Sequence, residues 1–351
     1  MLPPDRPAPD PDGPTSIGVI ANPSSGRDVR RLLGWASVFP VSEKVNVVLR
    51  LLSALGSLGV EQAWMLPDAA GIASRVREAA DLARSRHPMP QVRLLEMPIH
   101  DAARDSAHAA AALADLGVGL IAVLGGDGTH RAVAAHCGEV PLATLSTGTN
   151  NAFPRLREAT LVGVAAGLLV TGRVPPELGL RRNKCLRITG RGTDELALVD
   201  VCVSRELARG AGAIGDGAHL SEMFVAFAEP AQIGLSSIAG LSCPVSRDDP
   251  FGLHLQLGSG RTLQAPLLPG VLQPVSIAAA RRLLPGRPVP VHAARGTLVV
   301  DGERLIEFDD GHALQVELEL QGPRTLDVEA VLEVAARRGL LFDVPGPLAP
   351  E

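Results

Sequence analysis

The chain has 351 residues, of which 46% are hydrophobic and 20% are charged, a composition typical of a folded protein with two domains. A formal net charge of -5 argues against a nucleic-acid backbone or an anionic membrane as a partner. No apolar run approaches the roughly 20 residues that a membrane helix needs, and none of the four cysteines forms a CxxC pair, so we expect a reduced, cytoplasmic protein without a zinc or disulfide framework.

The N-terminal half alternates between apolar runs and helical patterns. Residues 1–15 are rich in proline and acidic side chains, and we expect a disordered tail there rather than a signal peptide. Within residues 16–173, strands are expected at 17–21, 62–66, 92–97, 118–124 and 141–145, and helices at 43–58, 70–86, 102–116 and from about 130 to 137. This alternation predicts an α/β, Rossmann-like domain with a parallel sheet and a nucleotide-binding role.

The pattern of apolar residues changes near residue 174, where the helical periodicity ends. Short β-prone runs separated by glycine- and proline-rich turns predict a β-rich domain over residues 174–326. The expected strands lie at 185–189, 196–204, 223–228, 253–257, 297–300 and 313–320. Residues 327–351 carry a C-terminal helix, expected at 327–340, and a tail.

A loop of glycines, "GGDGT", follows the strand expected at 118–124. Gly125, Gly126 and Gly128 would let a ligand touch the backbone, and the start of the next helix favours a phosphate. Thr129 adds a hydroxyl. A carboxylate repels phosphates unless it binds Mg2+ or accepts a proton from an attacking hydroxyl. The position of Asp127 in this loop therefore indicates an enzyme that transfers phosphoryl groups. The alternative is a tight turn with an N-capping aspartate.

Two further polar loops follow predicted strands. One contains Thr147, Gly148, Thr149 and Asn150, and the other contains Asn22, Pro23, Ser25 and Gly26. Each is also compatible with an ordinary Asx or Ser/Thr turn. Because the carboxyl ends of parallel strands share one edge of a sheet, we expect these loops and the glycine loop to meet there and bind a nucleotide.

Taken together, "NPSSG", "GGDGT" and "STGTNNAF" resemble the NAD kinase and diacylglycerol kinase superfamily. Longer stretches, among them "ANPSSGRDVRRL" and "FAEPAQIGLSSIAGL", resemble the acetoin catabolism protein X group within it. The resemblance implies an NAD kinase-like fold with ATP and Mg2+ as cofactors. It also implies that Asp127 is the proton acceptor or metal-linked carboxylate, that the glycines and Thr129 cradle phosphates, and that Asn150 contacts the nucleotide.

Two later segments extend the resemblance. "ALVDV" resembles the Asn-Glu strand of NAD kinases, with Val199 for Asn and Asp200 for Glu, and "VDGE" around Asp301 resembles the DGE turn of the β-rich domain. For Asp301, an ordinary Asp-Gly hairpin is the alternative. Asp200 and Asp301 therefore join the predicted nucleotide-binding residues. Val199 and Asn151, which stands where lipid kinases have Asp, depart from the family pattern.

Other motifs carry less weight. Residues 210–215 fit GxGxxG but lack a βαβ context, and neither lysine completes a Walker A sequence. His130 borders the glycine loop and is expected in the first helical turn rather than on a phosphate. His100, Asp101 and His108 do not have the spacing of a metal-ligand set.

The sequence therefore predicts an ATP- and Mg2+-dependent kinase that phosphorylates a hydroxyl. The favoured acceptor is the 2′-hydroxyl of NAD, which gives NADP, and the resemblance implies a link to acetoin catabolism and a homo-oligomer. The alternatives are a nucleotide-binding regulatory protein with impaired catalysis and a lipid or small-polyol kinase. The substitutions Val199 and Asn151 favour the first alternative, and the absence of a basic apolar patch disfavours a membrane substrate.

Overall fold

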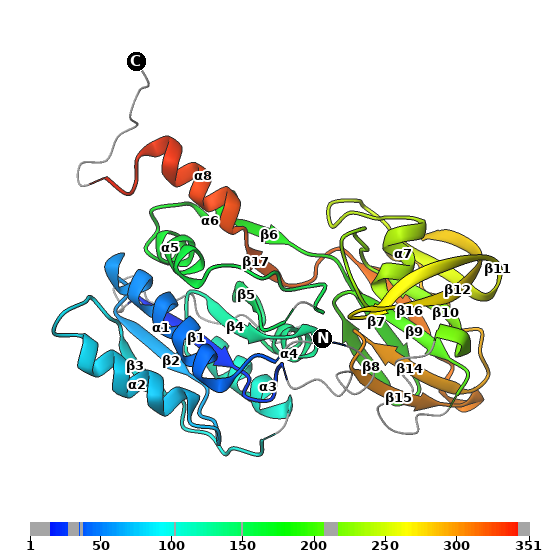
Figure 1. The fold of residues 1–351 in the computed structure, drawn as a ribbon, viewed down its shortest axis with the longest axis horizontal. Coiled ribbons are helices and arrows are strands. Elements are labelled where there is room, and N and C mark those ends of the chain that lie inside the picture. Colours follow the sequence, from blue (N-terminus) through cyan, green and yellow to red (C-terminus); the bar gives the residue numbers. More distant parts are fainter. Residues whose placement is uncertain are drawn as a thin grey trace.

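The chain folds into an α/β unit and a β-rich unit that lie side by side (Figure 1). A computed structural model of the protein describes residues 15–26, 35, 38–101, 103–148, 150–206 and 217–342. The model confirms the predicted fold class, a parallel-sheet N-terminal region followed by a β-rich region and a C-terminal helix. Among the described residues, none of the helices combines the length and the apolar character needed to cross a membrane.

The α/β unit is built on a seven-stranded sheet. Its strands run in the order β3 (Gln91–Leu94), β2 (Gln62–Met65), β1 (Ser16–Ala21), β4 (Ile121–Gly125), β5 (Leu142–Ser146), β17 (Arg324–Leu326) and β6 (Leu180–Arg182). All neighbours are parallel except β17 and β6. The central strands β1 and β4 are apolar on both faces because helices cover both.

Helices pack on both faces of this sheet. One apolar core joins it to α1 (Val41–Ser57), α2 (Ile72–Ala83), α5 (Ala159–Val170) and α8 (Val328–Arg338). A smaller core on the other face joins it to α3 (Ala103–Asp115) and α4 (Asp127–Ala134). The short α6 (Pro176–Gly179) lies next to α8.

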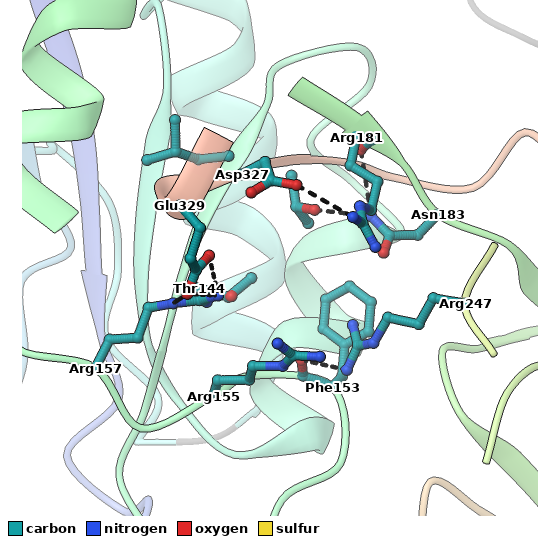
Figure 2. A pocket seen from close by; sticks show the side chains of 11 residues that line it. Thr144, Phe153, Arg155, Arg157, Arg181, Asn183, Arg247, Asp327 and Glu329 are labelled. Carbon is teal, nitrogen blue, oxygen red and sulfur yellow. Dashed lines mark hydrogen bonds and ion pairs between the residues drawn. The ribbon is translucent and has the colours of Figure 1, made fainter. Parts of the chain in front are cut away.

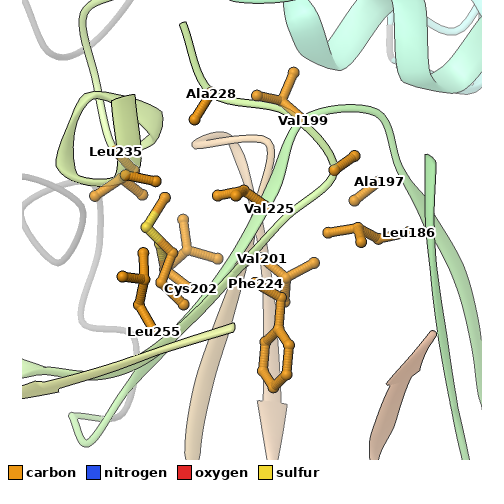
Figure 3. Packing of buried hydrophobic residues seen from close by; sticks show 14 of the residues in the cluster. Leu186, Ala197, Val199, Val201, Cys202, Phe224, Val225, Ala228, Leu235 and Leu255 are labelled. Atoms are coloured by element: carbon orange, nitrogen blue, oxygen red, sulfur yellow. The ribbon is translucent and has the colours of Figure 1, made fainter. Parts of the chain in front are cut away.

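The β-rich unit consists of two packed sheets. The six-stranded sheet has the order β12 (Val271–Leu283), β11 (Gly252–Leu268), β10 (Leu220–Val225), β9 (Asp200–Ser204), β14 (Gly296–Val300) and β15 (Arg304–Phe308). The four-stranded sheet has the order β13 (Val289–Pro290), β16 (Gln315–Glu319), β7 (Cys185–Gly190) and β8 (Thr193–Ala197). Side chains of both sheets, such as Leu186 and Phe224, and of α7 (Ser236–Ser242) share one core (Figure 3).

Several elements, such as β12, β15 and α7, were not predicted, and three further differences affect the architecture. Helix α5 was not predicted because it is apolar nearly all round and shows no polar stripe. The strand expected at 196–204 is two strands, since the chain leaves β8 in one sheet and enters β9 in the other. Strands β6 and β17 lie within residues 174–326 but complete the α/β sheet. The division into domains with the bounds given above stays a prediction.

Candidate functional site

The loops that follow β1, β4 and β5 meet at one edge of the α/β sheet. The Asn22 side-chain amide donates to Thr129 Oγ1 at 2.8 Å, and the Thr147 backbone N–H donates to the carbonyl of Gly125 at 3.3 Å. Gly26, with φ of 75°, lies close to the Thr147 carbonyl. Parallel pairing of β1 with β4 and of β4 with β5 brings the three loops together.

Neighbouring side chains leave no room for a larger residue at three glycines of the loop. A methyl group on Gly125 would lie 2.5 Å from Cβ of Thr129, and one on Gly126 would lie 2.9 Å from Oδ1 of Asn151. A third, on Gly128, would collide with the carboxylate of Glu303. The three glycines thus leave room for Thr129 of the same loop and for Asn151 and Glu303 of other segments.

Asp127 begins α4, and its carboxylate is directed at the loop after β5. Oδ1 accepts the backbone N–H of Phe153 at 2.8 Å, and Oδ2 accepts that of Ala152 at 2.9 Å. The side chain is mostly buried, since the residue is 8% exposed. Asp127 therefore ties the glycine loop to the 152–153 segment, a contact that the sequence did not predict.

Glu303 of the β-rich unit contacts the glycine loop. It is an exposed residue in the turn between β14 and β15, and its carboxylate lies against Gly126 and Gly128 at the start of α4. The N-terminus of a helix favours a negative charge because its first N–H groups have no partner in the helix. Glu303 is part of the "VDGE" segment, from which only Asp301 was predicted as a site residue.

Asp301 has a structural position in the same turn. It is buried, has φ of 49°, and accepts the backbone N–H groups of Leu198, Val199 and Asp200. Burial raises the pKa of the Asp301 carboxyl to about 6, although these hydrogen bonds and Arg131 act in the opposite direction. Arg131 of α4 lies 3.7 Å from Oδ2 of Asp301, so this carboxylate links the two units.

Asp200 and Val199 lie beside Asp301. The Asp200 carbonyl accepts the N–H of Asp301 at 2.9 Å, so Asp200 and Asp301 are in direct contact. Val199, which stands where NAD kinases have Asn, belongs to the apolar core of the β-rich unit (Figure 3). Asp200 and Asp301 are connected to the glycine loop through Arg131 of α4 and through Glu303, which lies in the same turn as Asp301.

In the loop after β5, the side-chain amide of Asn150 has no hydrogen-bond partner among the described residues. Both polar atoms of the Asn150 amide are buried and have no hydrogen-bond partner among the described residues, whereas Asn151 donates to Ser146 Oγ at 2.7 Å. Gly148 accepts a bond from Ser146 Oγ at 2.7 Å. Asn151 thus shapes the loop, and Asn150 has unused hydrogen-bonding capacity. The predicted site residue Thr149 lies outside the described residues, as does the 210–215 motif.

Lys44 was missed by sequence analysis. Its ammonium group is buried and donates to the carbonyls of Asn22, Pro23 and Ser25 at 2.9, 2.8 and 2.6 Å. Ser25 also donates to the Asn22 carbonyl at 2.8 Å. Lys44 therefore holds the first loop in shape, and the only signal was that the chain contains just two lysines.

His130 is part of the loop's support. Its Nδ1 lies 2.8 Å from the carbonyl of Gly126, and the ring is fully buried. Burial lowers the pKa of His130 to about 4, so the ring is neutral near pH 7. As expected, it lies in the first turn of α4.

Two cavities adjoin these loops. One of about 200 Å3 lies at the carboxyl ends of β1 to β3 and is lined by Asn22, Pro23 and Ser24 together with Leu66, Asp68 and Asp105. The other, also about 200 Å3, is surrounded by arginines (Figure 2). Arg157 pairs there with Glu329 at 2.7 Å, and Arg181 pairs with Asp327 at 3.2 Å. Arg155 and Arg247 both approach Glu229, at 3.4 and 3.8 Å, whereas the first cavity is lined by acidic side chains such as Asp68 and Asp105.

Comparisons with known proteins agree with this architecture. Residues 17–174 match the ATP-NAD kinase N-terminal domain, and residues 184–321 match the acetoin catabolism protein X C-terminal domain. The chain is 44% identical over 345 residues to acetoin catabolism protein X of Cupriavidus necator, an alignment that covers 95% of this chain and 96% of that protein. The chain belongs to the acetoin catabolism protein X family. The first match covers most of the α/β unit of this chain, and the second covers the β-rich unit.

Proposed function

We propose that the three loops bind the polyphosphate of ATP and that the protein transfers the γ-phosphoryl group to a hydroxyl. The favoured acceptor is the 2′-hydroxyl of NAD, which gives NADP. The observation that carries this proposal is the carboxylate of Glu303 against the start of α4. An anionic group of the chain already lies where a helix N-terminus and a glycine-rich loop favour phosphate.

Each neighbouring residue has a role in this proposal. Backbone N–H groups of the glycine loop and the side chains of Asn22, Thr129 and Thr147 hold the phosphates, and Asn150 donates and accepts with its free amide. The hydroxyl oxygen attacks the γ-phosphorus, the bond to the bridging oxygen breaks and ADP leaves. Asp127 accepts the hydroxyl proton, and bonds from Ala152 and Phe153 orient it.

Mg2+ fits the donors of this site. Glu303 supplies an exposed carboxylate next to the proposed phosphate position, and carboxylates with substrate phosphates are the usual ligands of Mg2+. When bound, the ion neutralises phosphate charge. Asp200 and Asp301 keep the "VDGE" turn in place, which positions Glu303.

The proposal also includes the cellular compartment and the binding partners. We place it in the cytoplasm, with a nucleotide, a hydroxyl-bearing acceptor and a second copy of the chain as partners. The name of the Cupriavidus necator relative connects that protein with acetoin catabolism, and we extend this link to the present chain.

The test is NADP formation by purified protein supplied with ATP, Mg2+ and NAD. We expect NADP with the unaltered chain and a loss of at least about 100-fold with Asp127→Asn, since general-base catalysis contributes about 10²–10⁴-fold. Asp310→Asn changes an exposed aspartate in the short 3-10 helix Asp310–His312 of the β-rich unit and should keep full activity. Melting temperatures of both variants establish that they fold. Equal NADP formation by Asp127→Asn would remove the proposed role of Asp127.

A second function, nucleotide sensing without catalysis, is favoured by two observations. Both oxygens of Asp127 already accept backbone N–H groups, and Val199 cannot supply the amide of an NAD kinase. In that case nucleotides would raise the melting temperature but no product would form from NAD, diacylglycerol or small polyols. Product from diacylglycerol or a polyol, but not from NAD, would instead assign the chain to a lipid or small-polyol kinase.

A further inference from the structure

Two histidines and one glutamate converge in the β-rich unit, away from the glycine loop. Nε2 of His254 lies 3.1 Å from Oε2 of Glu222, and Nδ1 of His292 lies 2.8 Å from the same oxygen. One possible ligand atom from each of the three side chains lies within 4.8 Å of the other two. None of the sequence motifs described above contains these residues.

The register of the six-stranded sheet explains the first pair. Strands β10 and β11 are antiparallel, and Phe224 lies opposite His254 while Glu222 lies opposite Gln256. Residues two apart in a strand share a face, so Glu222 and His254 are diagonal neighbours on one face. The ring of Phe224 stacks on His254 with centroids 4.3 Å apart and holds the imidazole in place.

The third residue comes from the segment between β13 and β14. The backbone N–H of His292 donates to Oε1 of Glu222 at 2.9 Å, so the main chain as well as the ring is attached to this carboxylate. Glu222 and His254 are buried, whereas the His292 side chain is 57% exposed. The cluster therefore has a closed side in the sheet and an accessible side at His292.

A cavity of about 330 Å3 opens on the accessible side. Glu222 and His292 form part of its wall, together with the polar side chains of Arg205, Ser221, Gln256 and Ser259. None of these residues belongs to the loops of the glycine-loop site. A group bound between the three side chains would face this cavity.

We propose that Glu222, His254 and His292 form a binding site for a divalent transition-metal ion, with Zn2+ as the best match. Two imidazoles and one carboxylate are the protein ligands of one class of catalytic zinc site, which keeps a further position open. With bonds of about 2.0–2.2 Å, the ligand atoms of a tetrahedral ion lie roughly 3.3–3.5 Å apart; the two N–O separations of this cluster, 3.1 and 2.8 Å, are shorter and would widen slightly around an ion. The proposal is independent of the kinase function.

An ion pair without metal is the competing explanation. A buried carboxylate needs compensation, but one histidine supplies it, and here two imidazole nitrogens approach the same carboxylate oxygen. A cation between them would satisfy the two nitrogens and the oxygen together. The open position toward the cavity would then admit an oxygen donor, and Arg205 in the cavity wall favours an anionic one.

The experiment uses the full chain after treatment with a chelator. Zn2+ or Co2+ is titrated into the protein, and metal content, the melting temperature and the visible absorption of bound Co2+ are measured. We expect one ion per chain and a rise in melting temperature, because an ion that binds the folded state stabilises it. His292→Ala should lower the affinity by about 100-fold or more, since loss of even an outer partner of a metal site costs about 10–100-fold.

His312→Ala is the matched control. Its Nδ1 also lies 2.8 Å from a carboxylate, that of Asp309, but this pair is not part of the Glu222 cluster. His312→Ala should bind the ion as the unaltered chain does. His292→Ala should still fold without metal because its side chain is largely exposed. Absence of binding in the unaltered chain, or equal affinities for it and His292→Ala, would overturn the proposal.

Discussion

The carboxylate of Glu303 lies against Gly128 in the first turn of α4, although these residues belong to different units of the fold. The contact places a negative charge at a helix N-terminus. It also closes the glycine loop from the side of the β-rich unit. Any phosphate bound to the loop must therefore share space with Glu303, be bridged to it by a cation, or displace it.

Replacement of Glu303 by Gln tests this relationship. If the carboxylate competes with phosphate, the variant should bind ATP about 2- to 30-fold more tightly when Mg2+ is absent, because a charge at a helix N-terminus contributes roughly 0.3–2 kcal/mol. With Mg2+ present the gain should shrink or reverse, since the proposed ligand of the ion is lost. Titration calorimetry measures both. Glu307→Gln, an exposed residue of β15, is the control and should change neither affinity.

Gly125 and Gly128 should respond differently to alanine. A methyl group at Gly125 meets Cβ of Thr129, which belongs to the same packed loop and cannot move away. At Gly128 it meets only the flexible end of Glu303. We expect Gly125→Ala to lower the free energy of unfolding by about 1–3 kcal/mol and Gly128→Ala to change it by less than about 1 kcal/mol, as measured by urea unfolding. Equal losses would contradict this difference in packing.

Lys44→Met should damage the first loop. The substitution leaves three carbonyls without their donor, so we expect a loss of about 2–4 kcal/mol in unfolding free energy. Backbone amides of residues 22–25 should exchange faster with solvent, and nucleotide affinity should fall. Lys184→Met is the matched control, because Lys184 donates to the carbonyls of Asp249 and Phe251 in the other unit. It should leave nucleotide affinity unchanged; a similar loss of affinity would show that Lys44 acts only through global stability.

His130 should make stability sensitive to acid. The pKa is about 4 in the folded state, against an ordinary value of 6.5, so the unfolded chain binds a proton first as the pH falls. The folded state is thus favoured above pH 6.5 and loses this advantage as the pH falls toward 4, by an amount on the order of 3 kcal/mol.

The measurement compares the unaltered chain with His130→Gln. Glutamine keeps an N–H donor for the Gly126 carbonyl but does not titrate. The difference in unfolding free energy between the two proteins should change between pH 6.5 and 4 and stay level above that range. A difference that is constant over the whole range would mean that His130 is as accessible to protons in the folded chain as in the unfolded one.

The sequence by itself determined the α/β half, the β-rich half and the loops that meet at one sheet edge. Alternation of apolar runs with helical patterns is a local property, and parallel pairing then forces the loops after β1, β4 and β5 together. The glycines, Asn22, Thr129 and Thr147 were accessible to the same reasoning. Helix α5 was not, because a buried helix carries no polar stripe to mark its period.

Only the tertiary structure decided which polar groups face one another. Asp127 reaches Ala152 and Phe153, Lys44 reaches the first loop, and Glu303 reaches Gly128. The Glu222 cluster likewise depends on the register of β10 with β11 and on a segment that crosses from β13. Such contacts join residues far apart in the chain, and sheet register and domain packing, which leave no periodic pattern in the sequence, determine them.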